Sequence, residues 1–176
     1  PAHFRARGPV AVRLDATRPG CNLGHGSVAG CPPGGGDGLR CLICIDDTDN
    51  IESRGTGELA SLLARALEKK GWGKSQPVTR HQMLVHPDIP YTSHNSSMCF
   101  AADIADEHLA AFTEFAKEFL ARESAEGSDP GLCIVNSEAL AGRDDLIAFG
   151  RKARQQVLTK EEAYGLAQRL GIHLSE

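Results

Sequence analysis

The sequence predicts an α/β (α+β) fold, in which a β-α-β-β-α-β unit of the split type forms a mixed sheet covered by helices and is followed by two C-terminal helices. Short apolar runs bounded by turn residues indicate strands, and longer segments with apolar residues at helical spacing indicate helices. They follow one another as strand, helix, strand, strand, helix, strand, helix, helix. A chain of 176 residues is long enough for one domain with a real core.

Residues 1–38 are rich in Gly, Pro and Arg, and we expect them to form a leader outside a single α/β domain at 39–176. One candidate strand in this leader, at 10–14, has alternating apolar side chains. The segment PPGGGDG at 32–38 is typical of a linker or a flexible loop.

The first half of the domain should contain two strands separated by a helix. The run at 39–45 is short, apolar and rich in Ile, Leu and Cys, which favours a strand buried on both faces. A helix is expected at 57–70, ending at Gly71. The strand expected at 78–85 has polar residues in its middle, which predicts a half-exposed or edge position.

The second half should begin with a strand at 98–104 and a helix capped by Asp106. The apolar stripe of that helix is more typical of a core than of a cofactor site, and it comprises Leu109, Phe112, Phe115, Ala116 and Phe119. A buried strand at 132–135 and a helix at 144–157 follow. Thr159 and Glu162 form a capping box for a last helix that ends at Gly171.

Composition narrows the function classes. The net charge of −4 and the pI near 6.0 provide no basic surface of the kind that nucleic-acid binders carry, which argues against this chain holding a nucleic acid alone. No apolar run reaches membrane-spanning length, and the start lacks the apolar region of a signal peptide. We therefore expect a cytoplasmic protein without a membrane partner, whose oligomeric state the sequence does not indicate.

The six cysteines do not pair by spacing. Cys41 and Cys44 are three residues apart in an expected strand and should face opposite ways, so they cannot bind one zinc ion as the cysteine pair of a zinc knuckle does. Cys99 and Cys133 lie in apolar runs and are expected to be buried thiols, as in a reducing cytoplasm. The leader contains three possible zinc ligands without a C-x-x-C pair, and an incidental occurrence is favoured for Cys21, His25 and Cys31.

Four carboxylates follow the first expected strand within seven residues, namely Asp46, Asp47, Asp49 and Glu52. They repel one another unless a cation, backbone N–H groups or water neutralises them. Magnesium suits this set, because it prefers one or two carboxylates together with waters and substrate phosphates. Calcium suits it less well, because an EF-hand loop begun at Asp47 would place Ile51 at a ligand position and Glu52 where Gly is required.

Side-chain alternation refines this metal site. In an extended strand Asp47 and Asp49 would share one face while Asp46 faced away, so the chain must turn at about Asp47 if all three serve one ion. Thr48, Asn50 and Ser53 are residue types that support such a turn by bonding their own backbone.

The acids are followed by Arg54, Gly55, Thr56, Gly57 and Glu58, which indicate a loop opening an amphipathic helix. Thr56 is the expected N-cap, Glu58 complements the positive end of the helix dipole, and the two glycines let the backbone approach a ligand closely. Such a helix start can hold a phosphate. The plain alternative is that the acids form only a polar turn and Thr56 serves only as a cap.

Three motifs in order, spanning about 39–157, resemble the ATP-dependent kinase domain of the agmatinylcytidine synthetases, which modify the wobble cytidine of an isoleucine tRNA. Ile45-Asp46-Asp47-Thr48-Asp49 resembles the signature I-D-D-T-D of that family. The stretch at 87–95 resembles its N-P-N-I-P-W…T-R-G-N segment, with His94 at the position of the Arg and one residue deleted. The stretch at 129–132 resembles its N-P-G-V strand entry.

The resemblance implies magnesium-dependent ATP binding and phosphoryl transfer to an acceptor that the sequence does not name. It places magnesium and phosphates on Asp46, Asp47 and Asp49, and a transient phosphate on Thr56. The other nucleotide-binding candidates are Arg54, Gly55, Gly57, His94, Asn95, Arg151 and Lys152. Two other interpretations stay open: a non-catalytic nucleotide or metal-binding regulatory module, and an RNA-modification subunit that needs a partner. The loop at 86–97 is likewise either a surface connection or a second wall of the nucleotide site.

Overall fold

The structure is a computed structural model that describes residues 38–89, 91, 95–140 and 144–176. Residues 1–37 of the predicted leader, with its candidate strand and possible zinc ligands, lie outside the described residues, as does His94. In chain order the elements are β1 (Gly38–Asp46), α1 (Thr56–Lys69), β2 (Gly73–Ser75), β3 (Thr79–Gln82), β4 (Ser96–Ala105), α2 (Asp106–Glu123), β5 (Gly131–Asn136), the 3-10 helix η1 (Glu138–Leu140), α3 (Asp144–Ala153), α4 (Lys160–Leu170) and β6 (His173–Ser175).

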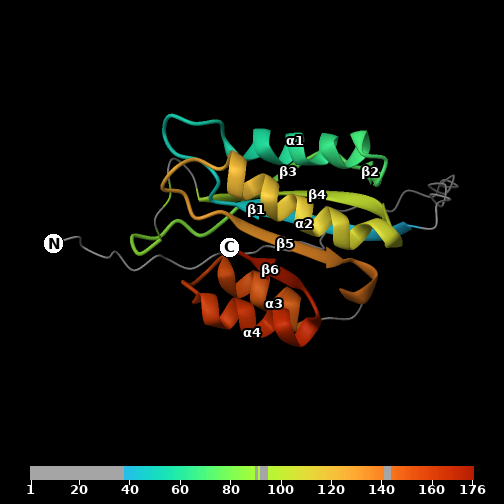
Figure 1. Cartoon of the computed structure of the whole chain (residues 1–176). Coiled ribbons are helices and arrows are strands. Elements are labelled where there is room, and N and C mark those ends of the chain that lie inside the picture. Colours follow the sequence, from blue (N-terminus) through green and yellow to red (C-terminus); the bar gives the residue numbers. More distant parts are fainter. Residues whose placement is uncertain (1–37, 90, 92–94, 141–143) are drawn as a thin grey trace, which may run out of the picture.

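The predicted α/β fold class is confirmed, although the sheet is antiparallel and not mixed as expected. Six strands form one sheet in the order β2-β4-β1-β5-β6, with β3 also paired to β4, and each of the strand pairs in the described residues is antiparallel. Helices α1 and α2 cover one face of this sheet, and α3 and α4 lie beside β5 and β6 (Figure 1). None of the helices in the described part of the chain has the length and hydrophobicity that crossing a bilayer requires.

Strands β2 and β3 lie one after the other along the same edge of β4. Between them the Gln76 N–H donates to the Ala101 carbonyl oxygen at 2.7 Å, so together they act as one interrupted edge strand of the β-α-β-β-α-β unit. A Cβ atom on Gly73 would lie 2.2 Å from the Asp103 carbonyl oxygen, and therefore only glycine allows β2 this approach. The strand predicted at 78–85 is shorter than expected but does lie at the edge.

The main core lies between the sheet and the helices α1 and α2. Ile43, Leu63, Phe100 and Phe112 are each at most 1% exposed, and burying such a side chain stabilises the fold by about 1.5–3 kcal/mol. The predicted stripe of α2 is confirmed as core, because three of its residues are buried and two are partly buried against the same cluster. The central strand β1 is thereby fixed, and the position of its end defines the site.

The helix ends agree in part with the prediction. Helices α1 and α4 are followed by Gly71 and Gly171, both with positive φ, as expected. Asp106 is not an N-cap: the N-cap of α2 is Ala105, because the helical backbone already includes Asp106, which lies inside the first turn. Helix α3 ends at Ala153 rather than 157, because tight turns after Arg151 and Lys152 lead the chain to the start of α4.

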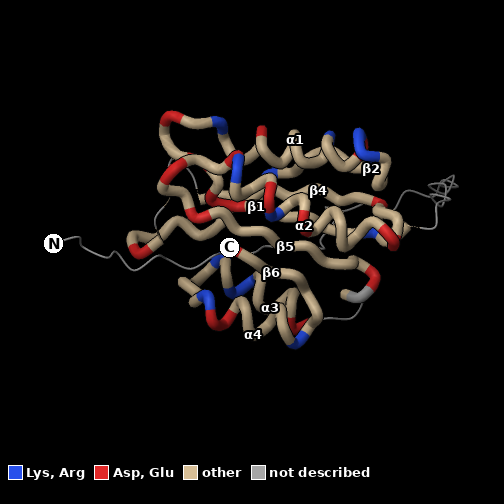
Figure 2. Tube along the Cα trace, in the orientation of Figure 1, with Lys and Arg blue, Asp and Glu red and all other residues tan. Residues whose placement is uncertain are grey.

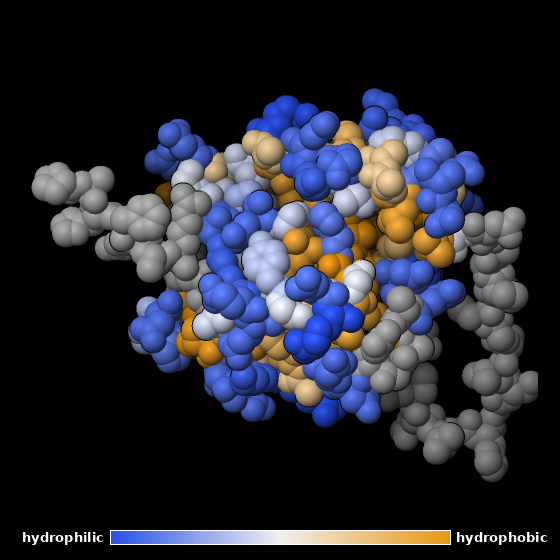
Figure 3. All heavy atoms as spheres, turned by 60° about the horizontal axis from the view of Figure 1, so that its bottom comes forward, coloured by the Kyte–Doolittle hydropathy of each residue, from blue (hydrophilic) through white to orange (hydrophobic). Residues whose placement is uncertain are grey.

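Charge is unevenly distributed along the sheet. Acidic residues gather at the end where β1 enters the loop to α1 (Figure 2). The side of the molecule that carries α3 and α4 is mostly hydrophilic, with apolar side chains visible between the polar ones (Figure 3).

Candidate functional site

Strand β1 ends at Asp46, and the backbone turns out of the strand conformation at Asp47, which has a φ of 46°. The Asp47 N–H donates to Asp46 Oδ1 at 2.9 Å, so the first acid is tied to the start of the turn. A positive φ is uncommon outside glycine, although Asp tolerates it better than most residues. The backbone thus leaves the strand at Asp47, the residue at which a turn was expected if all three acids were to serve one ion.

The loop beyond this turn is held by its own polar side chains and by the turn between α2 and β5. The Asn50 N–H donates to Ser53 Oγ at 2.8 Å, as predicted for these two residues. The Ala125 N–H donates to the Thr48 carbonyl at 2.9 Å, and the Asp129 N–H donates to the Asp47 carbonyl at 3.2 Å. These bonds between segments far apart in sequence bring Asp129 to the acidic loop.

Thr56 is the first residue of α1 and not its N-cap, which corrects the prediction. The N-cap is Gly55, and no side chain caps this helix start. The Thr56 hydroxyl instead accepts from Thr48 Oγ1 at 3.0 Å and donates to Asp49 Oδ1 at 3.3 Å. Thr48 and Thr56 are only 0% and 6% exposed. The buried chain of two hydroxyls therefore aims the Thr56 oxygen at an acid.

The pKa values of two of these acids, Asp46 and Asp47, are raised, so both ionise less readily than a free aspartate. Burial raises the pKa of Asp46 to about 7, and the neighbouring carboxylates of Asp47 and Asp49 raise it further against the effect of one backbone hydrogen bond. Burial also raises the pKa of Asp47, with Asp129 and Asp49 contributing in the same direction. A cation that bound here would relieve this repulsion.

The structure also places a lysine next to these acids. Lys160, the first residue of α4, donates to Asp129 Oδ2 at 3.1 Å and to Glu176. Burial alone would lower the pKa of Lys160, but its hydrogen bonds to Glu176 and Asp129 outweigh this effect and raise the pKa. Sequence reasoning did not select Asp129 or Lys160 as site residues, because only the packing of the α2–β5 turn against α4 brings them to the loop.

Within the described ranges, no three His, Cys, Asp or Glu side chains converge as a preformed metal cage. Magnesium does not require such a cage, because it is commonly held by one or two carboxylates plus phosphate oxygens. A Cβ atom on Gly55 would point toward Asp49 Oδ2 at 3.9 Å, so the glycine leaves space beside that carboxylate at the helix start.

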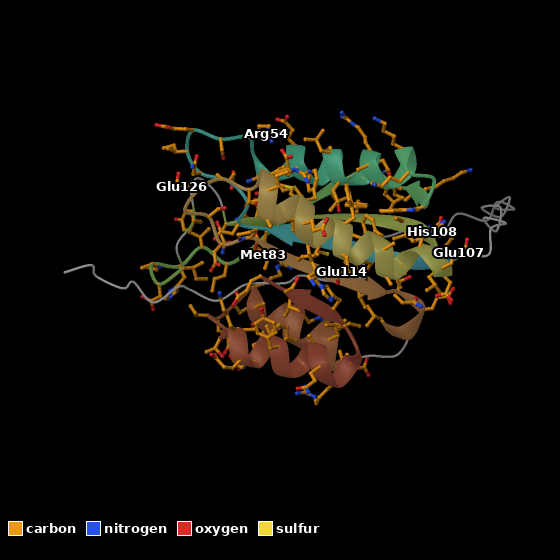
Figure 4. All side chains as sticks on the ribbon, in the orientation of Figure 1. Arg54, Met83, Glu107, His108, Glu114 and Glu126 are labelled. Carbon is orange, nitrogen blue, oxygen red and sulfur yellow. The ribbon has the colours of Figure 1, made fainter. Side chains whose placement is uncertain are left out.

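Two of the predicted bases, Arg54 and Lys152, are already paired with acids outside the aspartate motif. Arg54 donates to Glu123 Oε2 at 2.7 Å, which ties the loop before α1 to the end of α2. Arg54 and Glu126 lie at the same end of the molecule (Figure 4). On α3, Lys152 donates to Glu162 at 2.9 Å and thus contacts the capping box of α4, while the neighbouring Arg151 is exposed.

Asn95 closes the loop between β3 and β4. Its side-chain Nδ2 donates to the Leu84 carbonyl at 2.5 Å, and its own carbonyl accepts from the Met83 N–H at 2.8 Å. Asn95 is 8% exposed, and Met83 is 4% exposed. Asn95 thus has a clear structural role in shaping the loop that the sequence offered as a second wall of the site.

The chain is similar in sequence to two known proteins. No protein-family model matches the chain. The isoleucine-tRNA 2-agmatinylcytidine synthetase TiaS of Methanosarcina acetivorans is 29% identical over 135 residues, which cover 74% of this chain and 31% of that protein. The same enzyme of Methanocorpusculum labreanum is 27% identical over 134 residues, covering 74% of this chain and 30% of that protein. The chain is related to part of TiaS.

Solved structures of TiaS show the same fold. The complex of TiaS with its isoleucine tRNA and ATP matches with a TM-score of 0.65 and 25% identity over 78% of this chain and 32% of that one. The complex of TiaS with the same tRNA, AMPCPP and agmatine matches with a TM-score of 0.64, also at 25% identity and with the same coverage. This chain therefore spans about a third of the length of TiaS, and the resemblance that the aspartate motif predicted is confirmed.

Proposed function

We propose that this chain is a magnesium-dependent ATP-binding domain that transfers a phosphoryl group. The observation that supports this most is the start of α1, where an uncapped helix end and the Thr56 hydroxyl face an acid at the end of β1. A helix start attracts phosphate through its N–H groups and its dipole. A structure of TiaS bound to ATP and its tRNA gives independent support, because that protein shares this fold.

The proposed roles follow from the contacts. Asp46, Asp47 and Asp49 supply hard oxygen ligands, of which one or two would hold magnesium with the nucleotide phosphates. The magnesium would neutralise phosphate charge during transfer. The backbone at 55–57 would receive the phosphates, and Arg54 and Lys160 supply positive charge nearby.

Thr56 is proposed to accept the phosphoryl group transiently. Its hydroxyl donates to Asp49 Oδ1, so this carboxylate orients the oxygen and can take its proton as the new bond to the γ-phosphorus of ATP forms. The bond from that phosphorus to the bridging oxygen breaks at the same time, and ADP is the leaving group. The second oxygen of Asp49 faces the space beside Gly55. In this arrangement the acid and the nucleophile come from the two ends of a single loop.

A second candidate function is ATP binding without turnover. The absence of a preformed three-ligand cage among the described residues, and the lysine that already pairs with Asp129, would also suit a regulatory nucleotide site. In either case we propose a cytoplasmic role in RNA modification in which other domains or a partner subunit hold the RNA, because the net charge of −4 does not favour tRNA binding by this chain alone.

Calorimetric titration of ATP in magnesium and then in EDTA tests the proposal. We expect binding in magnesium that weakens at least about tenfold in EDTA, and the same loss in Asp47→Asn and Asp49→Asn. Both variants should stay folded or gain slight stability, because removing like charges relieves repulsion. Glu107→Gln is the matched control, since Glu107 lies at the other end of the molecule (Figure 4). Equal affinity in both buffers would refute magnesium dependence.

A further inference from the structure

Three cysteines form a row across neighbouring strands on the sheet face that α1 and α2 do not cover. In the strand register Cys44 of β1 lies directly opposite Cys99 of β4 on one side and Cys133 of β5 on the other. These three thiols form a cluster of their own, whereas Cys41 packs into the main core on the opposite face, as predicted. All three are free thiols and are buried, with Cys99 at 7% the most exposed.

The backbone hydrogen bonds determine which neighbour of Cys44 is closer. The Ser137 N–H, just after β5, donates to the Arg40 carbonyl at 2.7 Å, so the backbone groups of Arg40 point toward β5. Alternate residues of an antiparallel strand direct these groups to the same neighbour, and the register of β1 is continuous. The backbone groups of Cys44 therefore also point toward β5 and Cys133.

The backbone hydrogen bonds of β4 also indicate that Cys44 and Cys99 do not bond each other through their backbones. The Ala101 carbonyl accepts from Gln76 at 2.7 Å, so Ala101, and with it Cys99, directs its backbone groups toward the β2–β3 edge and away from β1. Cys44 and Cys99 are thus a non-hydrogen-bonded pair, and Cys44 and Cys133 are a hydrogen-bonded pair. In antiparallel sheets the Cα atoms of these two kinds of pair are about 4.5 Å and about 5.5 Å apart, with side chains closer in the first kind.

We infer that Cys44 and Cys99 form a cross-strand site that a hydroperoxide oxidises to a disulfide, and that Cys133 does not take part. A disulfide needs Cβ atoms about 3.5–4.5 Å apart, which favours the non-hydrogen-bonded pair. The pKa shifts of the two thiols agree with this pairing, because Cys44 lowers the pKa of Cys99 while Cys99 raises the pKa of Cys44.

The chemistry assigns different roles to the two sulfurs. The hydrogen bond from Cys44 lowers the pKa of the Cys99 thiol against the effect of burial, whereas burial raises the pKa of Cys133 to about 12. Cys99 attacks the peroxide and takes one oxygen as sulfenic acid, releasing an alcohol, or water from hydrogen peroxide. The Cys44 sulfur then displaces that oxygen as water. Two thiols are oxidised, one peroxide is reduced and two hydrogens leave the protein.

Peptide mapping of the full chain after hydrogen peroxide treatment tests the site. We expect a disulfide-linked pair of peptides containing Cys44 and Cys99, which thioredoxin or dithiothreitol reverses. Cys133→Ala should keep the link, and Cys44→Ser, which keeps a hydrogen-bond donor beside Cys99, should abolish it while leaving a sulfenic acid on Cys99 that a 1,3-dione reagent traps. The wild-type mapping does not depend on any variant folding, and it does not depend on ATP binding.

Three results would overturn the inference. They are a Cys44–Cys133 link as the main product, a link from Cys44 or Cys99 to a cysteine of the leader, and both thiols remaining reduced at peroxide concentrations that oxidise an exposed control thiol.

Discussion

Helices α1 and α4 both begin beside a threonine, but only α4 uses its threonine to close its own first turn. Thr159 accepts from the Glu162 N–H at 3.2 Å and Glu162 accepts from the Thr159 N–H at 2.9 Å, which completes a capping box. At α1 the N-cap is glycine, and the hydroxyl of Thr56 is directed to Asp49. The contrast shows where the chain stabilises a helix and where it leaves a helix start open to a ligand.

The largest expected effect is at Thr56. If its hydroxyl carries the phosphoryl group, Thr56→Val should lose phosphoryl transfer completely, while magnesium-dependent ATP binding and the fold remain. Thr56→Ser keeps the hydroxyl and should keep the activity. Mass spectrometry after incubation with ATP should find phosphate on the peptide that contains Thr56 in wild type. Unmodified Thr56, together with full transfer in the Val variant, would exclude it from the mechanism.

The next effect is a pH dependence of stability that comes from Asp46. Its pKa is raised to about 7 in the folded state by burial, compared with about 3.9 in an unfolded chain. Between these values the folded state binds more protons, so the free energy of unfolding should fall as the pH rises from about 4 to about 8. At about 1.4 kcal/mol for each pKa unit, we expect a loss of roughly 2–4 kcal/mol.

Chemical denaturation at about pH 5 and about pH 8 measures this loss. Asp46→Asn cannot ionise at this position, so its stability should depend much less on pH than that of wild type. Magnesium with ATP should likewise reduce the wild-type loss, because a bound cation stabilises the ionised acids. An unchanged pH dependence in the Asn variant would mean that Asp46 is already ionised in the folded protein.

A smaller effect is expected at α4, where the cap is complete. Thr159→Ala should lower the free energy of unfolding by about 1 kcal/mol, because a helix N–H loses its partner. Thr159→Ser should retain most of the stability, and ATP binding should be nearly normal in both variants. Loss of ATP binding in a folded Thr159→Ala variant would instead show that the start of α4, with Lys160, is coupled to the acidic loop.

Much of the fold was predictable because its signals are local. Buried strands such as β1, the apolar stripe of α2 and the capping box of α4 each follow from neighbouring residues. The strands β2 and β6 have three residues each, which is too short for a periodic pattern to reveal.

The site was predictable only in part, for a related reason. The turn at Asp47 follows from adjacent residues, but the hydroxyl of Thr56 bonds Asp49 rather than the helix because the fold buries Thr48 against it. Likewise, Asp129 and Lys160 meet only through packing between segments 31 residues apart. Local sequence patterns do not contain such contacts.

The smallest expected effect concerns Gly55, and it tests the comparison of the two helix starts directly. A serine at this N-cap position can accept a hydrogen bond from a helix N–H, so Gly55→Ser should raise the free energy of unfolding by a few tenths of a kcal/mol. The same hydroxyl would then compete with phosphate for that N–H, and ATP binding should weaken.

Gly55 has an ordinary φ of −69°, and an added Cβ atom would make only van der Waals contact with Asp49 at 3.9 Å. Gly55→Ala is therefore the matched control, because it adds the same bulk without the hydroxyl. Paired denaturation and calorimetry on the two variants separate the effects. If Ser and Ala weaken ATP binding equally, the space beside Asp49 matters and the open N–H groups do not; if neither weakens it, the start of α1 is not where the phosphates bind.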